Sequence, residues 1–370
     1  MEQYTRRIAK IEAVLDRWLP EAPGRAWAEQ VFPGLAGRIP PDLLKVLCNP
    51  GRDLLNRGGK RWRPLLQTLV CESAGGGEAA LLLTPLTEFC HNASLIHDDI
   101  EDSSDERRGK PAVHLLHGID ASINSGCFLY FLPLACIEEW EKNLSEQRSG
   151  EEAAAIEKNR IFSLWGEHMR RLHLGQAMDI AWHRDFESLP SLDDYYTMCS
   201  LKTGCLARLA ALLGAAAAEA VQPRQNRTAR IDVRLLGKAA EDLGVGFQIF
   251  DDVKNLTEGI PGKKRGDDVV EGKKSLPVLL YLHRRPDKRD FAGRCFSAAR
   301  KGGAAVPEIM ELISAMEREG VLEEGQRKGL SLIEGSKKLF EKAFAEYAPS
   351  GVEYQNDPLR LLLGLPDLLS

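Results

Sequence analysis

Two clusters of acidic side chains could carry chemistry in this sequence, and each follows an apolar stretch. The first is DDIED at residues 98–102, directly after Leu95-Ile96-His97. Asp98 and Asp102 are four residues apart, so a helix would stack them on one face, where like charges repel unless a cation joins them. Hard oxygen ligands beside an apolar wall suit Mg²⁺ that carries a substrate phosphate. Taken alone, this cluster is equally compatible with a solvated acidic helix end.

The second cluster consists of Asp251, Asp252 and Asn255, after the apolar run FQIF. Asp251 and Asn255 are again one helical turn apart. Two such clusters in one helical chain are stronger evidence of function than either alone. Carboxylates that face one another from two helices would hold several Mg²⁺ ions around one diphosphate.

Basic residues that would match a diphosphate lie near both clusters. The segment GGKRWRP at residues 58–64 is a tight loop whose glycines let the backbone approach a phosphate closely. Arg107 and Arg108 follow the first cluster, and arginine donates to phosphate oxygens in a bidentate fork. Three lysines add positive charge later in the chain: Lys202, Lys263 and Lys273. Each cation alone would read as a surface group, so the prediction depends on their order and spacing.

Helices are expected to position these groups, because helical periodicity dominates and alternating strand patterns are scarce. Thr84-Pro85 is a good helix start, and that helix is predicted to end near Arg107-Arg108-Gly109. On this helix His91 lies two turns before Asp98, on the same face. Further helices are predicted over residues 120–140 with a bend at Pro133, 161–182, 193–214, 229–256 and after Ala304. Residues 49–64 and 258–277 are predicted to be loops.

Bulk composition narrows the function classes. The 370 residues carry a net charge of −5 and are 44% hydrophobic, so a packed core is expected and a general nucleic-acid role gets no support. No signal-peptide pattern and no membrane span are recognised. The eight cysteines show no C-x-x-C spacing and read as reduced, buried thiols, which predicts a cytoplasmic protein.

Several segments together resemble the trans-isoprenyl diphosphate synthases, also called the polyprenyl synthetase family. The matching pieces run in family order over residues 58–277: GGKRWRP, HNASLIHDDIEDSSDERRGKP, LKTG, GVGFQIFDDVKNL and GKKRGDDVVEGKKSLP. The resemblance implies an isoprenoid synthase fold, with antiparallel helices around a central cavity. It also implies one domain over residues 1–370, with a helical C-terminal segment from about 304 that matches weakly, in a homodimer or larger homo-oligomer. The implied reaction joins isopentenyl diphosphate head-to-tail to an allylic diphosphate.

The resemblance also implies a role for each matching residue. Mg²⁺ would be bound by Asp98, Asp102 and Asp251, with Asp99, Asp252 and Asn255 supporting them. The allylic diphosphate would be held by Arg107, Lys202 and Lys263, with Lys273 nearby. Isopentenyl diphosphate would be held by Lys60, Arg63, His91 and Arg108, and the active site would also be lined by Thr203 and Gln248. Among these, Asp98, Asp102, Asp251, Arg107 and Lys202 would be catalytic.

Two departures and the helix before Asp98 bear on product length. Asn255, and Cys127 after Gly126, replace aspartates found in many members, as in geranylgeranyl diphosphate synthases of the eukaryotic type. Ala93 and Ser94, five and four residues before Asp98, are small, which disfavours a fifteen-carbon stop. The aromatic pair Tyr130 and Phe131 would form a deeper floor, which predicts a twenty-carbon product. Both rings could instead be ordinary core residues, and a longer chain is the alternative product.

Three other functions compete with this interpretation. A class I terpene cyclase also uses an aspartate-rich helix and Mg²⁺, but it would leave GGKRWRP and Arg107-Arg108 idle. A non-catalytic subunit of a heteromeric synthase is expected to lose metal aspartates, whereas both clusters are intact here. A nucleic-acid patch at GKKRGDD conflicts with its acidic neighbours.

Overall fold

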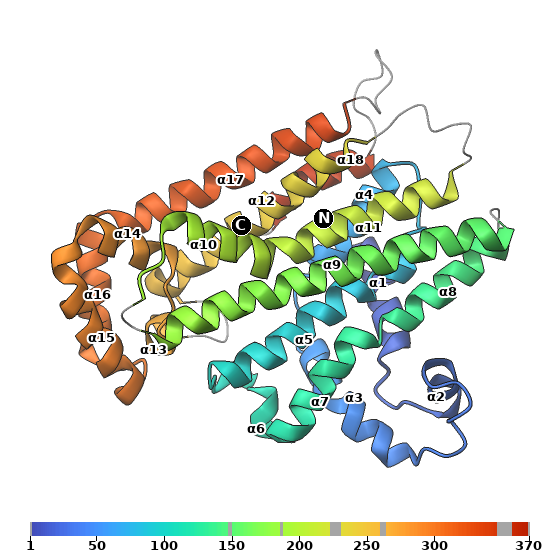
Figure 1. The fold of residues 1–370 in the computed structure, drawn as a ribbon, viewed down its shortest axis with the longest axis horizontal. Coiled ribbons are helices and arrows are strands. Elements are labelled where there is room, and N and C mark those ends of the chain that lie inside the picture. Colours follow the sequence, from blue (N-terminus) through green and yellow to red (C-terminus); the bar gives the residue numbers. More distant parts are fainter. Residues whose placement is uncertain are drawn as a thin grey trace.

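The computed structural model is a helical bundle (Figure 1) and describes residues 2–146, 150–185, 188–222, 231–259, 264–345 and 357–368. Within these ranges the only sheet is a two-residue antiparallel pair, in which β1 (Glu106–Arg107) faces β2 (Lys110–Pro111). The predicted all-α class is therefore confirmed.

The first half of the chain forms the helices from α1 to α9, and α9 is the longest helix among the described residues. They are α1 (Glu2–Trp18), α2 (Arg25–Val31), α3 (Pro41–Asn56), α4 (Trp62–Ser73), η1 (Leu81–Leu83), α5 (Pro85–Glu101), α6 (Val113–His117), α7 (Ile119–Phe131), α8 (Leu134–Leu144) and α9 (Gly150–Arg184).

The helices of the second half include a short π-helical segment, η3. They are α10 (Leu192–Cys199), η3 (Ser200–Gly204), α11 (Cys205–Val221), α12 (Val233–Thr257), α13 (Asp267–Glu271), α14 (Leu276–Arg284), η5 (Pro286–Lys288), α15 (Arg289–Gly302), α16 (Pro307–Arg318), α17 (Val321–Ala343), α18 (Asp357–Gly364) and η6 (Leu365–Leu368).

The core of the bundle forms around α11, which packs against α4, α9 and α12. Nearly all of its alanines and leucines are buried, so α11 is apolar on every side, as a central helix must be. Two described stretches, residues 119–144 and 192–221, are long and apolar enough to cross a membrane by length and composition. In the most apolar 18 residues of each stretch, the share buried inside the fold is 44% for residues 119–144 and 78% for residues 192–221. Core packing therefore accounts for most of the apolar character of the second.

A second hydrophobic cluster lies at one end of the bundle, where α14, α15 and α16 gather (left in Figure 1). The long helices α12 and α17 pack along each other and contribute side chains to both clusters. This sharing supports one continuous unit, although the division of the chain into domains stays a prediction.

Helix α5 begins at Pro85 as predicted, but it ends at Glu101 rather than near residues 107–109. The chain leaves the helix at Ser103, whose φ is +55°, and turns back through the β1–β2 hairpin with Arg108 at +54°. The Arg107 side chain bonds back to the buried carboxylate of Asp99. This return contact replaces the expected extra helical turn and brings the two arginines beside the acidic cluster.

The loop predicted over residues 49–64 is wrong at both ends, since α3 continues through Pro50 to Asn56 and α4 begins at Trp62. The Gly51 N–H donates to Ser125 Oγ of α7 at 3.1 Å, which stabilises the helix after the proline. A Cβ on Gly51 would lie 2.8 Å from Leu129, so the glycine also lets α3 approach α7 closely. The predicted bend at Pro133 is confirmed as the break between α7 and α8. The loop predicted over 258–277 contains the short helix α13.

Candidate active site

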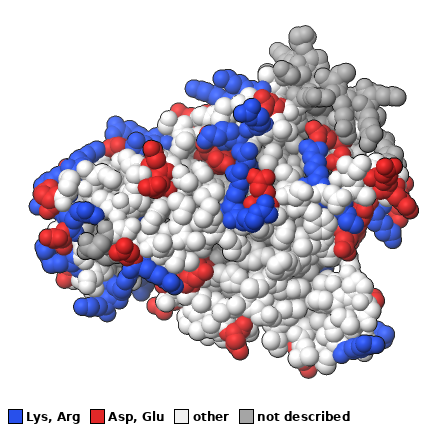
Figure 2. Space-filling model, viewed as in Figure 1, with Lys and Arg blue, Asp and Glu red and all other residues white. Residues whose placement is uncertain are grey.

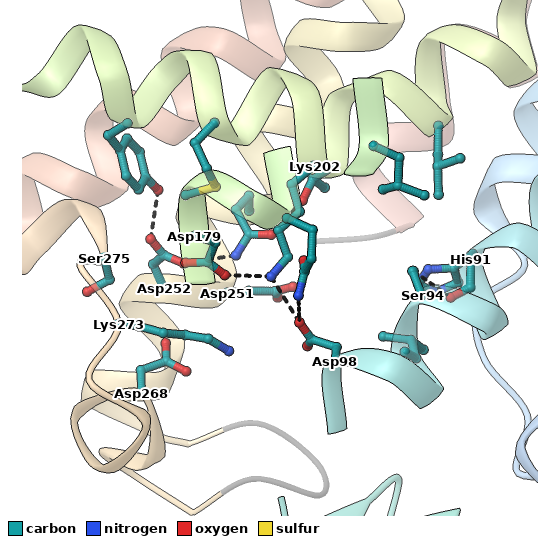
Figure 3. Close-up of a pocket in the computed structure, with 18 of the residues that line it drawn as sticks. His91, Ser94, Asp98, Asp179, Lys202, Asp251, Asp252, Asp268, Lys273 and Ser275 are labelled. Atoms are coloured by element: carbon teal, nitrogen blue, oxygen red, sulfur yellow. Dashed lines mark hydrogen bonds and ion pairs between the residues drawn. The ribbon is translucent and has the colours of Figure 1, made fainter. Parts of the chain in front are cut away.

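A cavity lies where α5, α9, η3 and α12 converge, and it is lined by most of the residues predicted to act. Figure 3 shows carboxylates gathered around Lys202, with His91 and Ser94 further along α5. Its predicted lining residues are Arg63, His91, Ser94, Asp98, Arg107, Lys202, Thr203, Gln248, Asp251, Asp252 and Lys273. Segments from residue 63 to residue 273 are thus brought together at one place.

Lys202 ties the first acidic cluster to α9. Its Nζ donates to Asp98 Oδ1 at 3.0 Å and to Asp179 Oδ2 at 2.6 Å. Burial alone would lower the pKa of Lys202, but the carboxylates of Asp179 and Asp98 outweigh it and raise this pKa. Gln176 Nε2 donates to Asp98 Oδ1 at 3.0 Å and to Glu101 Oε2 at 2.6 Å. The first aspartate of DDIED therefore faces two donors from separate helices.

The π-helical segment η3 decides where Lys202 points. Five residues, Ser200–Gly204, widen the helix between α10 and α11, and such π-bulges are common at functional sites. Helix α9 approaches this segment so closely that a Cβ on Gly175 would lie 2.5 Å from the backbone nitrogen of Lys202. The glycine is therefore needed for the contact that sets Lys202 beside Asp179.

In the second cluster, the two aspartates have different environments. Asp252 is buried and accepts hydrogen bonds from Tyr195 Oη at 2.7 Å, Gln248 Nε2 at 2.9 Å and the Leu276 N–H at 3.0 Å. Asp251 faces the cavity and is exposed there, yet partial desolvation raises the pKa of its carboxyl to about 6, and Asp252 adds to this shift. Asp252 thus anchors the helix end, while Asp251 is the one presented to a ligand.

Asn255 does not take the metal-supporting position that the sequence predicts. It is 1% exposed and does not line the cavity, and its Oδ1 accepts the backbone N–H of Asp268 at 3.2 Å. The reason is the turn of α12 at this point, which directs residue 255 toward the segment entering α13. Asn255 therefore positions Asp268, whose side chain does line the cavity.

The remaining predicted ligands of the first cluster are already engaged with cations. The Asp102 side chain is 1% exposed and lies 2.9 Å from Lys273 Nζ, which also contacts Glu271 at 2.6 Å. Burial, opposed by Lys273 and reinforced by Asp98, raises the pKa of Asp102 to about 6. Asp99 is fully buried against Arg107. Asp98 is thus the member of DDIED that lines the cavity, with Asp102 and Asp99 behind it.

The α4 end of the same cavity is a basic pocket. Arg63 and His91 line the cavity, and Arg108 is adjacent, with its guanidinium directed to the Gly58 carbonyl. Among the described residues, neither Arg63 nor Arg108 forms a salt bridge, and Arg63 Nε is buried without a hydrogen-bond partner. Burial, then Arg63 and Arg108, hold the pKa of His91 well below its usual range, so His91 is neutral. This pocket is suited to an anion.

Lys60 and Arg61 belong to the same motif as Arg63, but they do not line the cavity. Lys60 is exposed and outside the cavity lining, although its charge acts on Asp251. Arg61 is buried and pairs with Glu12 at 2.7 Å and Glu88 at 2.8 Å, so it holds the loop in place. Of the basic residues in GGKRWRP, the structure brings Arg63 into the cavity.

The carboxylates fit a hard cation such as Mg²⁺. In the part of the chain that the structure describes, no three acidic, histidine or cysteine side chains already converge on one point. Mg²⁺ is usually held by one or two carboxylates and completed by water and substrate phosphate oxygens, so separate carboxylates around a cavity match its needs. Burial raises the pKa values of Asp102 and Asp251, and a neighbouring aspartate adds to each shift, so a bound cation would stabilise both ionised carboxylates.

The residues predicted to set product length are divided between wall, core and surface. Ser94 lines the cavity, whereas Ala93 is fully buried behind it. Tyr130 is 7% exposed, and its ring lies between His97 at 5.8 Å and His173 at 5.2 Å, measured between centroids. Phe131 is 60% exposed and contacts Trp165 at the surface. The floor predicted from both rings therefore fails for Phe131, because successive helical positions point in different directions.

Other lining residues were not predicted from the sequence. The cavity is also lined by Gln176, Asp179, Tyr195, Asp268, Lys274 and Ser275. The available signal was the spacing of Gln176 and Asp179, which are three residues apart and so lie on one face of a helix. Of the two aspartates after Gly266, only the structure selects Asp268. The predicted ligand Lys263 lies outside the described residues.

Comparisons with known proteins agree with this geometry. Residues 44–313 match the polyprenyl synthetase family. A geranylgeranyl pyrophosphate synthase of Rhodocybe pseudopiperita is 38% identical over 207 residues, 55% of this chain and 54% of that protein. A geranylfarnesyl diphosphate synthase of Aeropyrum pernix is 32% identical over 246 residues, 64% of this chain and 70% of that protein.

A solved structure shows the same fold over nearly the whole chain. It is the geranylgeranyl pyrophosphate synthase of Corynebacterium glutamicum, complexed with isoprenyl diphosphate and magnesium, with a TM-score of 0.70, 25% identity and coverage of 97% and 98%. The chain spans about half the length of curated relatives such as the Rhodocybe protein. Since the family match covers well over half of its residues, this chain belongs to the polyprenyl synthetase family.

Proposed function

We propose that this protein is a prenyltransferase that condenses isopentenyl diphosphate with an allylic diphosphate. The observation that carries the proposal is the division of one cavity into two anion sites. One contains cavity-facing carboxylates of Asp98 and Asp251 beside Lys202, and the other contains Arg63 and neutral His91. A single-substrate terpene cyclase would have no use for the second site.

The residues of the chain divide the work between the two diphosphates. Lys202 and Arg107 would donate to the oxygens of the allylic diphosphate as its C–O bond breaks and charge builds on the leaving group. Arg63, His91 and Arg108 would hold isopentenyl diphosphate, whose double bond attacks the allylic carbon to form the new C–C bond. The departing diphosphate would take up the proton that is released.

The wall between the two sites is apolar, which suits a carbocation. The side chains of Leu95, Leu172, Met198 and Leu206 line the cavity. A dry wall at this position would exclude the water that would otherwise quench the cation to an alcohol.

We further propose Mg²⁺ as the cofactor, held by Asp98 and Asp251, with Asp102 behind Asp98. When bound, Mg²⁺ neutralises charge on the allylic diphosphate and acts as a Lewis acid. The proposal is supported by the all-oxygen donor set and by the magnesium named for the Corynebacterium relative.

The product we propose is the twenty-carbon geranylgeranyl diphosphate, with a longer chain as the alternative. Small Ser94 lines the cavity wall, and Tyr130 is buried between His97 of α5 and His173 of α9. Relatives named for twenty-carbon and for twenty-five-carbon products are similarly distant, so the names alone do not decide between them.

We propose a homo-oligomer whose interface includes α6, α7 and α9. Figure 2 shows one face of the molecule with a broad area that carries few charged side chains, over the lower part of the bundle. Exposed apolar side chains on these helices are Leu115, Leu116, Ile119, Ile123, Phe131, Ile156 and Leu174. A patch of this kind marks an interaction site. A cytoplasmic location is part of the same proposal, supported by water-soluble substrates and by eight free thiols.

A turnover assay with the purified chain tests the proposal. The reaction would contain Mg²⁺, isopentenyl diphosphate and either dimethylallyl, geranyl or farnesyl diphosphate, with products identified by mass spectrometry. Chain elongation that requires both substrates and Mg²⁺ is expected. Conversion of an allylic diphosphate alone would favour a cyclase, and no conversion of any kind would favour a non-catalytic partner subunit.

A further inference from the structure

Arg57, at the end of α3, is outside every segment to which a role has been given, yet its side chain is 0% exposed. Its Nε and Nη2 atoms donate to the two carboxylate oxygens of Asp53 at 3.1 and 2.9 Å. Its Nη1 atom donates to the carbonyl oxygens of Arg107 at 3.0 Å and Pro111 at 2.8 Å. One guanidinium therefore connects α3 to both strands of the β1–β2 hairpin.

The hairpin also contacts α3 through a second arginine, Arg108. Arg108 Nη1 donates to the Gly58 carbonyl and, at 3.3 Å, to the Leu54 carbonyl, so it holds the end of α3 and the loop after it. The two segments are thus joined in both directions by arginines that bind backbone carbonyls. Arg57 binds the hairpin, and Arg108 of the hairpin binds the chain on either side of Arg57.

Both segments adopt backbone conformations that need external support. Arg108 and Arg61 have φ values of +54° and +47°, which are unfavourable for residues with a side chain. Gly58 and Gly59 have φ values of +80° and +141°, and a Cβ at residue 59 would lie 3.2 Å from Arg108. The glycines tolerate these values, but the strain at Arg61 and Arg108 persists only where surrounding contacts fix it, and such strain is concentrated at functional sites.

We propose that Arg57 is a positioning residue that fixes the hairpin so that Arg108 stays in the isopentenyl diphosphate pocket beside His91. The inference rests on the proposed function. Asp53 holds the Arg57 fork in plane, and His117 Nε2 lies 3.1 Å from Asp53 Oδ2 on its other side. The carbonyl contacts leave the guanidinium of Arg57 buried, so it acts through Arg108 and not on substrate.

The test compares Arg57→Met with Arg52→Met, a matched control on the same helix. Arg52 also binds a carboxylate and a carbonyl, at Asp16 and Leu19, but it holds α3 to the end of α1 and not to the hairpin. We expect Arg57→Met to raise the KM for isopentenyl diphosphate by about tenfold to a hundredfold, the range for a misplaced binding group. The KM for the allylic substrate should change by less than about threefold in both variants, because the Arg107 side chain keeps its own anchor at Asp99 when Arg57 no longer binds the Arg107 carbonyl.

Two further variants separate positioning from simple loss of stability. Arg57→Lys keeps the positive charge, but a single ammonium group cannot reach Asp53 and both carbonyl oxygens at once. Its KM for isopentenyl diphosphate should therefore stay close to that of Arg57→Met. In the Arg57→Met/Arg108→Met double variant the KM for isopentenyl diphosphate should match that of Arg108→Met alone, because both act on one pocket.

Each result has a clear meaning. Equal KM increases for both substrates, or the same selective increase in Arg52→Met, would show that Arg57 is only structural and overturn the inference. If the wild type condenses the two substrates and Arg57→Met leaves the KM for isopentenyl diphosphate unchanged, this inference is overturned while the proposed function stands. A wild-type chain that never uses isopentenyl diphosphate would overturn both.

Discussion

Lys202 and Arg63 line the same cavity, but their surroundings differ. Lys202 lies within 3.0 Å of two carboxylates, so its charge is already neutralised by the protein. Arg63 is buried, lies 4.5 Å from the ring of Trp62, and forms no salt bridge among the described residues. The carboxylate side is balanced by its own lysines, which an incoming cation and diphosphate would have to rearrange. The arginine side keeps its positive charge ready for an anion.

The largest expected effect comes from removing a cavity-facing carboxylate. Asp98→Ala or Asp251→Ala should reduce turnover by roughly a thousandfold or more, because metal-assisted charge stabilisation is worth several kcal/mol. The Tm at pH 7 should be unchanged or higher for Asp251→Ala. Its folded pKa of about 6 lies above the usual value, so the ionised form at pH 7 opposes folding.

Activity and thermal unfolding, with and without Mg²⁺, measure both parts of this prediction. Asp290→Ala, at an exposed position in the first turn of α15, is the control and should behave like wild type in both assays. Near-normal rates for Asp98→Ala at saturating Mg²⁺ would refute the metal assignment.

The second prediction contrasts two basic residues of one loop. Arg63→Met should raise the KM for isopentenyl diphosphate by about ten- to a hundredfold, the cost of one charged hydrogen bond. Lys60→Met should raise it less, because Lys60 is exposed and lies outside the cavity lining. Steady-state kinetics with each substrate varied in turn give both values. A selective increase in the KM for the allylic substrate would contradict the division of the cavity.

The third prediction uses neighbouring aromatic residues with opposite environments. Tyr130→Ala should shift the product mixture to chains longer than twenty carbons, because it removes a buried ring that packs between His97 and His173. Phe131→Ala should leave chain length unchanged, since that side chain is 60% exposed. Mass spectrometry of the products decides. If Phe131→Ala lengthens the products and Tyr130→Ala does not, Tyr130 is not the residue that limits chain length.

The smallest effect is expected at His91. Since the pKa of His91 is held well below its usual range, the ring is neutral from pH 6.5 to 8.5 and contributes hydrogen bonds, not charge. His91→Gln should therefore change the KM for isopentenyl diphosphate by less than about threefold. In the wild type, this KM should show no histidine titration over that pH range. An inflection near pH 6.5 that disappears in His91→Gln would show that a charged imidazole binds the substrate.

The sequence was sufficient for the helical class, the start of α5, the break at Pro133 and most of the residues that meet in the cavity. These features depend on local rules. Pro85 suits a first helical turn, apolar periodicity marks the buried faces, and two DD clusters with intervening basic motifs have a recognisable order. Helix α3 was missed because Pro50 and Gly51 usually end helices. Here the tertiary contacts with Ser125 and Leu129 override that preference.

The tertiary structure alone decided which member of each motif is available to a ligand in the cavity. Asp251 and Asp252 both line it, but Asp251 is exposed there while Asp252 is held by Tyr195 and Gln248. Arg63 enters the cavity, whereas Arg61 pairs with Glu12 and Glu88. Asp251 and Asp252 have the same chemistry in the sequence, but a helix directs adjacent residues about 100° apart, so their neighbours on other helices determine their roles. Arg61 lies just before α4 with a φ of +47°, whereas Arg63 is in its first turn. The contact of Arg57 with the hairpin joins residues 50 and 54 positions apart, and no local pattern encodes it.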